Sequence, residues 1–125
     1  MRLILFSVAD ELLSCQTIKI TLKNDVLAHQ GDCQGTYELS ALVNGKPSWT
    51  SHSKAIWYCQ DKKIWVIGRL NNIGKPNGPI YTRGMLLGAN ANHKWIYKCE
   101  KNWKELETND FSIECITRKG KVLRI

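Results

Sequence analysis

The chain has 125 residues, 43% of them apolar and 23% charged, which suits one globular domain and excludes a disordered or collagen-like chain. Eighteen Lys and Arg residues stand against 11 Asp and Glu residues, a formal net charge of +7. The excess is confined to residues 62–104, which hold nine basic residues and one acidic residue, Glu100, for a net charge of +8. A basic region of this kind favours an anionic partner.

The N-terminal segment, residues 1–16, fits two interpretations. Its one basic residue, Arg2, its short apolar run and the small-x-small ending of that run fit a short or remnant secretory signal. A first strand or a helical turn fits the same residues. No apolar run approaches the 18 residues that a membrane-spanning helix needs, so we expect no membrane span. Residues 17–125 are expected to form a single Trp-rich β domain.

The five cysteines fit two interpretations. None belongs to a CxxC pair, which argues against a structural zinc site of the usual spacing. In a secreted chain, four of them could form two disulfides of open connectivity, whereas in a cytosolic chain they are small buried apolar residues. We favour the secretory pathway slightly over the cytoplasm. The five residues are Cys15, Cys33, Cys59, Cys99 and Cys115.

Strand patterns begin at residue 17. Alternating apolar and polar residues predict strands over 17–22 and 36–43, separated by a turn and an ambiguous stretch over 26–30. Asn44-Gly45 predicts a hairpin, because both central residues of a type I′ turn need a positive φ. Pro47 cannot donate a hydrogen bond to a ladder, so the return strand is expected to start at or after residue 48.

Further strands follow along the rest of the chain. β-Branched and aromatic residues predict them over 55–59, 64–68, 79–83, 94–99, 111–117 and 122–125. Gly- and Asn-rich loops are predicted over 69–79 and 84–93. Eight or nine short strands at this spacing predict an all-β fold, a single-domain antiparallel sandwich or distorted barrel.

Aromatic and basic residues coincide in the second half of the chain. Within 94–99, Trp95 and Tyr97 share one face of the predicted strand and Lys98 lies on the other. Trp49 follows a turn and Trp103 lies in a polar run, so these two tryptophans are the candidates for exposure. The candidate ligand-binding residues are therefore Trp103, Trp95, Lys98, Lys101, Lys104 and, as an outlying candidate, Trp49.

Catalytic chemistry finds little support. A nucleophilic pair of Cys59 or Cys99 with His52 or His93 lacks a local signature, and both cysteines lie in predicted strands. The three histidines, of which His29 is the third, are scattered along the chain. We therefore expect a protein that is not an enzyme and needs neither a cofactor nor a metal.

The sequence favours a binding module that presents residues 62–104 to an anionic glycan or protein partner. Lysines would meet the anions, and exposed rings would stack on flat faces. A nucleic-acid-binding β-barrel is the first alternative, although 13 Lys against five Arg argues against bidentate reading of bases or phosphates. A structural subunit of a larger assembly is the second. The same lysines would also protect a sheet edge from aggregation. The oligomeric state is not indicated.

Overall fold

A computed structural model describes residues 15–84, 86, 94–118, 120 and 122–124. The predicted N-terminal segment lies outside the described residues except for 15 and 16, and so does most of the predicted loop over 84–93. In the described ranges, no helix is long and apolar enough to cross a membrane.

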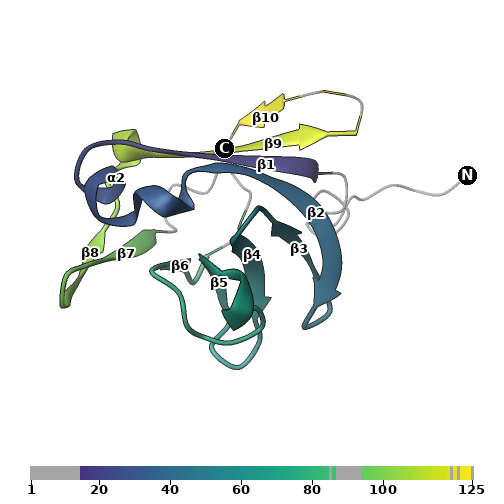
Figure 1. Ribbon diagram of the computed structural model, residues 1–125, viewed down its shortest axis with the longest axis horizontal. Coiled ribbons are helices and arrows are strands. Elements are labelled where there is room, and N and C mark those ends of the chain that lie inside the picture. Colours follow the sequence, from purple (N-terminus) through teal and green to yellow (C-terminus); the bar gives the residue numbers. More distant parts are fainter. Residues whose placement is uncertain (1–14, 85, 87–93, 119, 121, 125) are drawn as a thin grey trace, which may run out of the picture.

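The described residues form ten antiparallel strands in one curled sheet, in the order β10-β9-β1-β2-β3-β4-β5-β6-β7-β8. The strands are β1 Cys15–Leu22, β2 Gly35–Val43, β3 Lys46–Thr50, β4 Lys54–Cys59, β5 Ile64–Arg69, β6 Ile80–Thr82, β7 Trp95–Cys99, β8 Asn102–Glu105, β9 Phe111–Thr117 and β10 Val122–Arg124. The helix α2, Asn24–Gln30, packs against β7 (Figure 1). The predicted all-β, single-domain class is confirmed, and the sheet has the shape of half a barrel.

The hairpin between β2 and β3 forms as predicted, with positive φ values of 54° at Asn44 and 79° at Gly45. The expectation that Pro47 lies before the return strand is wrong, because β3 already begins at Lys46. Residue pairs in an antiparallel hairpin alternate between hydrogen-bonded and non-hydrogen-bonded pairs. Leu42 and Pro47 form the second pair from the turn, which is a non-hydrogen-bonded one, so the missing N–H of Pro47 costs no hydrogen bond to β2. The β4 ladder starts only at Trp49, so the ring of Pro47 interrupts no hydrogen bond there.

Two elements differ from the predicted ones. The ambiguous stretch after the first strand is the helix α2, which begins at Asn24 with a φ of 57° and buries Val26. The polar run after β7 is the edge strand β8, all four residues of which are exposed. An edge strand with no buried side chain carries no alternating apolar pattern, so periodicity could not have indicated it.

The main core lies on the inner face of the curled sheet. It contains aliphatic residues from β1, β4, β5, β6 and β9 together with five aromatic side chains, which are Tyr37, Trp49, Trp65, Trp95 and Tyr97. Trp49 is 0% exposed, and its Nε1–H donates to the carbonyl oxygen of Cys15 at 2.9 Å. The predicted exposure of Trp49 is therefore wrong: the residue lies within a central strand, opposite Leu39 and Ile56.

A second cluster covers the outer face of β4 and β5. Its buried members are Ala55, Trp57, Cys59, Ile64 and Val66. The indole of Trp57 donates to the carbonyl oxygen of Lys75 at 2.9 Å, which fastens the segment between β5 and β6 over this cluster. Because both faces are covered here, β5 is an unbroken apolar run over residues 64–67, unlike the alternating strands β7 and β9.

One disulfide, Cys15–Cys115, joins the neighbouring strands β1 and β9 across a sequence separation of 100 residues. The other three cysteines are buried free thiols, namely Cys33, Cys59 and Cys99. Burial raises the pKa of the Cys33 thiol to about 11. The structure thus holds one bridge and three thiols, between the two arrangements that the sequence left open.

Removal of the disulfide is expected to destabilise the protein. In the chain-entropy account, a crosslink across so long a loop restricts the unfolded chain, and such bridges typically contribute about 2–4 kcal/mol. The variant with both Cys15→Ala and Cys115→Ala should therefore lose free energy of unfolding of this order in urea titrations. Reducing agent should lower the stability of the native protein and leave that of the variant unchanged. Equal midpoints for the two proteins under oxidising conditions would contradict the assignment.

Gly78 is expected to tolerate no side chain. A Cβ at this position would lie 2.2 Å from Val66 Cγ1 and 3.0 Å from the Ile67 carbonyl oxygen. Gly78→Ala should therefore lower the free energy of unfolding by about 1–3 kcal/mol through overpacking. Gly31→Ala is the matched control, because its Cβ would make only an ordinary contact at 3.6 Å with Leu27. Equal urea midpoints for the two variants would refute this account.

Candidate functional site

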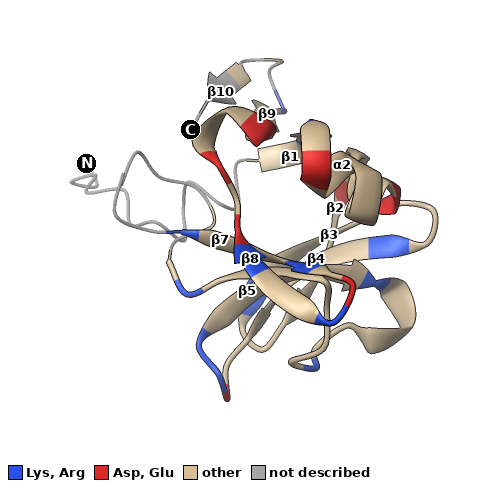
Figure 2. Ribbon diagram, turned by 90° about the vertical axis from the view of Figure 1, so that its left-hand side faces the viewer, with Lys and Arg blue, Asp and Glu red and all other residues tan. Residues whose placement is uncertain are grey.

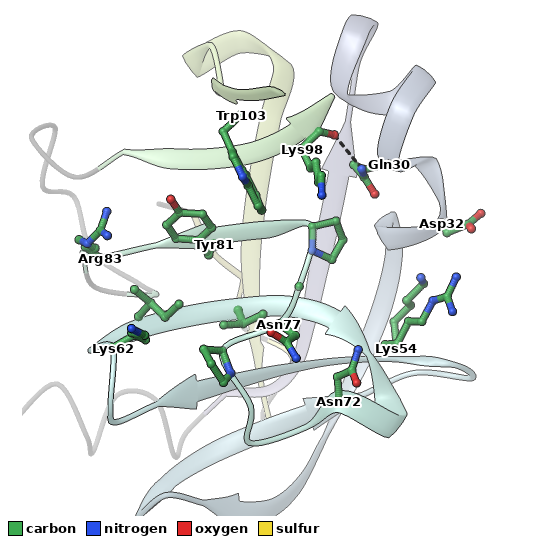
Figure 3. Close-up of a pocket in the computed structure, with 16 residues that line it drawn as sticks. Gln30, Asp32, Lys54, Lys62, Asn72, Asn77, Tyr81, Arg83, Lys98 and Trp103 are labelled. Carbon is green, nitrogen blue, oxygen red and sulfur yellow. Dashed lines mark hydrogen bonds between the residues drawn. The ribbon is translucent and has the colours of Figure 1, made fainter. Parts of the chain in front are cut away.

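The outer face of β5 to β8 carries an open groove with a volume of about 940 Å³ (Figure 3). Ile64 and Val66 of the second cluster lie at its apolar base, and the segment 76–79 forms one wall. Its charged lining residues are Lys54, Lys62, Arg69, Arg83, Lys98 and Asp32. Five cations against one carboxylate make this groove strongly basic.

The strand registers explain why the aromatic residues of the groove meet. Val66 pairs with Tyr81 and Tyr81 pairs with Ile96, so all three side chains leave the sheet on the outer face. Lys98, two residues beyond Ile96, shares this face and pairs with Trp103 on β8. The alternation that buries Trp95 and Tyr97 on the inner face therefore turns Lys98 and Trp103 toward the groove.

Two rings and two cations form the centre of the groove. The rings of Tyr81 and Trp103 lie 5.2 Å apart, edge to face at 74°. Lys98 Nζ lies 5.7 Å from the centre of the Trp103 ring, and Arg83 Cζ lies 5.7 Å from the centre of the Tyr81 ring. Trp103 is 48% exposed, so its indole is a platform that solvent and ligands reach. Cation–π contacts of this kind hold each cation beside a ring.

Hydrogen bonds fix the frame around these residues. The N–H of Lys98 donates to the Pro79 carbonyl oxygen at 2.8 Å, and the Gln30 side chain donates to the Lys98 carbonyl oxygen at 2.7 Å. Figure 3 shows Lys62 and Arg83 at one end of the groove and Lys54 at the other, with Tyr81 and Trp103 between. The positive charge therefore flanks the aromatic centre on two sides.

Charge is unevenly distributed over the described residues. Blue Lys and Arg segments predominate over β4, β5, β7 and β8, whereas red Asp and Glu segments gather around α2 and β9 (Figure 2). Part of the predicted basic region 62–104, namely Lys62, Arg69, Arg83 and Lys98, thus lines the groove together with Lys54 of β4.

The six candidate residues do not come together in one place. Trp103 and Lys98 lie in the groove, and Lys101 is exposed in the turn between β7 and β8. Trp95 is only 6% exposed and packs 4.9 Å from Phe111, so neither it nor the buried Trp49 offers a ring to a ligand. Side chains alternate along β7, so Trp95 points to the buried inner face whereas Lys98 points to the outer face, where a ligand could reach it.

Lys104 lies on the other face of the hairpin formed by β7 and β8. Its register partner is Tyr97, and its Nζ is 3.6 Å from Asp25 Oδ2 of α2. The charge of Asp25 raises the pKa of Lys104 above its usual value. Lys104 therefore belongs to the contact between α2 and β8 and does not line the groove.

Sequence reasoning missed several residues of the groove. Tyr81 and Arg83 alternate along the predicted strand 79–83, so their common face could have been inferred from that period. Lys54 and Arg69 pair directly across β4 and β5, and that pairing was available from the predicted hairpin. Asp32 comes from the turn after α2, and only the fold brings it to the groove.

No protein-family model, curated protein or solved structure matches this chain.

Trp103 is expected to account for most of the collisional quenching of tryptophan fluorescence by iodide. The other four indoles are at most 6% exposed, and the cations beside Trp103 attract the anion. Trp103→Phe should remove most of the Stern–Volmer slope, whereas the control Trp95→Phe should retain it. A full slope in Trp103→Phe would mean that another indole is exposed.

Proposed function

We propose that this protein is a non-enzymatic binding module whose groove binds an acidic polysaccharide, one that carries sulfate or carboxylate groups. The observation that carries the proposal is the central set of Arg83, Tyr81, Trp103 and Lys98, in which each of the two rings has a cation beside it. Further cations at both ends suit a ligand whose negative charges repeat along its length.

The chemistry of such a ligand matches the groove group by group. Lysine and arginine side chains bind sulfate and carboxylate oxygens through charge-assisted hydrogen bonds. The C–H face of a sugar ring packs on the exposed indole of Trp103, as apolar faces pack on aromatic rings. Asn72 and Asn77, which also line the groove, offer amide donors and acceptors for hydroxyl groups.

Two features favour a polysaccharide over a single-stranded nucleic acid. Proteins that bind single strands stack successive bases on several rings, whereas this groove has one well-exposed indole, with Tyr81 set edge-on to it. The disulfide Cys15–Cys115 is typical of oxidising compartments, where acidic polysaccharides are available as ligands. Both features support the proposal of a polysaccharide ligand.

The test measures binding of a highly sulfated heparin oligosaccharide by calorimetry over a range of salt concentrations. Trp103→Ala is expected to weaken binding by about tenfold, the equivalent of ~1.4 kcal/mol, through loss of stacking. The variant with both Arg83→Ala and Lys98→Ala should weaken binding and flatten its salt dependence, because two ionic contacts are lost. Lys19→Ala is the matched control, since it removes an exposed charge on β1 outside the groove.

Three outcomes would contradict the proposal. The first is the absence of binding at low salt. The second is a loss of affinity in Lys19→Ala as large as that in the variant with both Arg83→Ala and Lys98→Ala, which would mean that net charge alone drives association. The third is tighter binding of oligo(dT) than of the sulfated oligosaccharide, with the same dependence on Trp103, which would establish the nucleic-acid alternative.

A further inference from the structure

A separate cluster of ligand-type side chains lies where α2 packs on β7. Asp25 and His29 are one helical turn apart on α2, and Cys99 is the last residue of β7. His29 Nε2 lies 3.2 Å from Cys99 Sγ, and His29 Nδ1 lies 3.3 Å from Asp25 Oδ1. One ligand atom from each of the three residues lies within 4.8 Å of the other two. From the sequence we considered His52 or His93 as the partner of Cys99; in the described residues the ring beside Cys99 is that of His29, and His93 lies outside them.

The histidine is held in the form that binds metals. Its Nδ1 lies 3.0 Å from the backbone carbonyl oxygen of Asp25, which can only accept a hydrogen bond. In the tautomer that donates to this oxygen, the proton is on Nδ1, and Nε2, which lies 3.2 Å from Cys99 Sγ, is the nitrogen that can bind a metal ion. This arrangement, with Nδ1–H bonded to a carbonyl and Nε2 available, is the usual one for a histidine ligand.

The other two side chains are also positioned. The Tyr97 hydroxyl donates to the Asp25 carboxylate, an outer-shell contact that orients this oxygen ligand. Cys99 is 7% exposed and fixed at the end of a strand, whereas the Asp25 and His29 side chains are 45% and 28% exposed. The cluster thus combines the buried sulfur of Cys99 with two side chains on α2 that are accessible to an ion from solvent.

We propose that Asp25, His29 and Cys99 form a binding site for a divalent transition-metal ion of the zinc type, with a fourth position open to water. Thiolate, imidazole and carboxylate are established zinc ligands, and a thiolate selects against Mg²⁺ and Ca²⁺. The Zn–N and Zn–S bond lengths place two such atoms about 3.5 Å apart in tetrahedral geometry, close to the 3.2 Å between Nε2 and Sγ. Binding converts the thiol to a thiolate and releases its proton to solvent.

Lys104 competes with a metal ion at this site. Its Nζ lies 3.6 Å from Asp25 Oδ2, so it neutralises the same carboxylate that would bind the ion. The Lys104 side chain is 52% exposed on a flexible stem, and an incoming ion can displace it into solvent. Removal of this ammonium group is therefore expected to tighten metal binding, an effect that a purely structural role for the cluster would not produce.

The test titrates the full, untagged chain with Co²⁺ alone, followed by absorption spectroscopy, and then displaces the cobalt with Zn²⁺. We expect one Co²⁺ per chain and a thiolate-to-cobalt charge-transfer band that Cys99→Ser abolishes. His29→Gln and Asp25→Asn should each weaken binding at least tenfold, and Lys104→Met should tighten it by several-fold. The matched controls are His52→Asn, which removes an exposed imidazole, and Cys59→Ser, which removes another buried thiol.

Binding of neither ion at neutral pH would overturn the proposal. Cobalt binding without the charge-transfer band, or with a band that survives Cys99→Ser, would also overturn it. Lys104→Met alters only an exposed side chain, so its result remains interpretable if a variant of Cys99 or His29 fails to fold. An unchanged or weaker affinity in Lys104→Met would show that the ion does not bind at Asp25.

Discussion

The inward packing of Trp95 and Tyr97 is the constraint on which both candidate sites depend. These side chains lie in the main core, and a slip of one residue along β7 would turn them to solvent. With that register fixed, Lys98 points outward and Trp103, its partner on β8, lies beside Tyr81. The groove is therefore a consequence of how the core is packed. The buried inward residues of β6 and β7 fix the outward direction of Tyr81 and Lys98, and the pairing of β8 with β7 then places Trp103 beside them.

The fold was largely predictable where local chemistry decides the structure. Asn44-Gly45 favours its hairpin because both residues readily adopt a positive φ. The dense apolar residues of β4 and β5 predict strands from the local sequence alone. Prediction failed where tertiary pairing decides. Strand β8 exists because it pairs with β7, and Trp49 is buried because a central strand extends past Pro47. Neither fact is contained in a local pattern of apolar residues.

The candidate site was predictable to the extent that its residues are neighbours along the chain. Lys98 and Trp103 belong to one hairpin, so their combination of charge and ring was visible in the sequence. Lys54 comes from a part of the chain whose charges nearly balance, and its contribution depends on the pairing of β4 with β5. His29 and Cys99 are 70 residues apart, and only the packing of α2 on β7 brings them together.

The hairpin of β7 and β8 serves both faces of the sheet at once. Lys98 and Trp103 face the groove, whereas Cys99 and Lys104 face α2. Strand alternation thus places the groove and the cluster of Asp25, His29 and Cys99 on opposite faces of this hairpin. Gln30 is the direct link between the two sites, because it ends the helix that carries two of the proposed metal ligands and donates to the carbonyl oxygen of Lys98. An ion that holds α2 against β7 would therefore also hold the backbone from which Lys98 reaches into the groove.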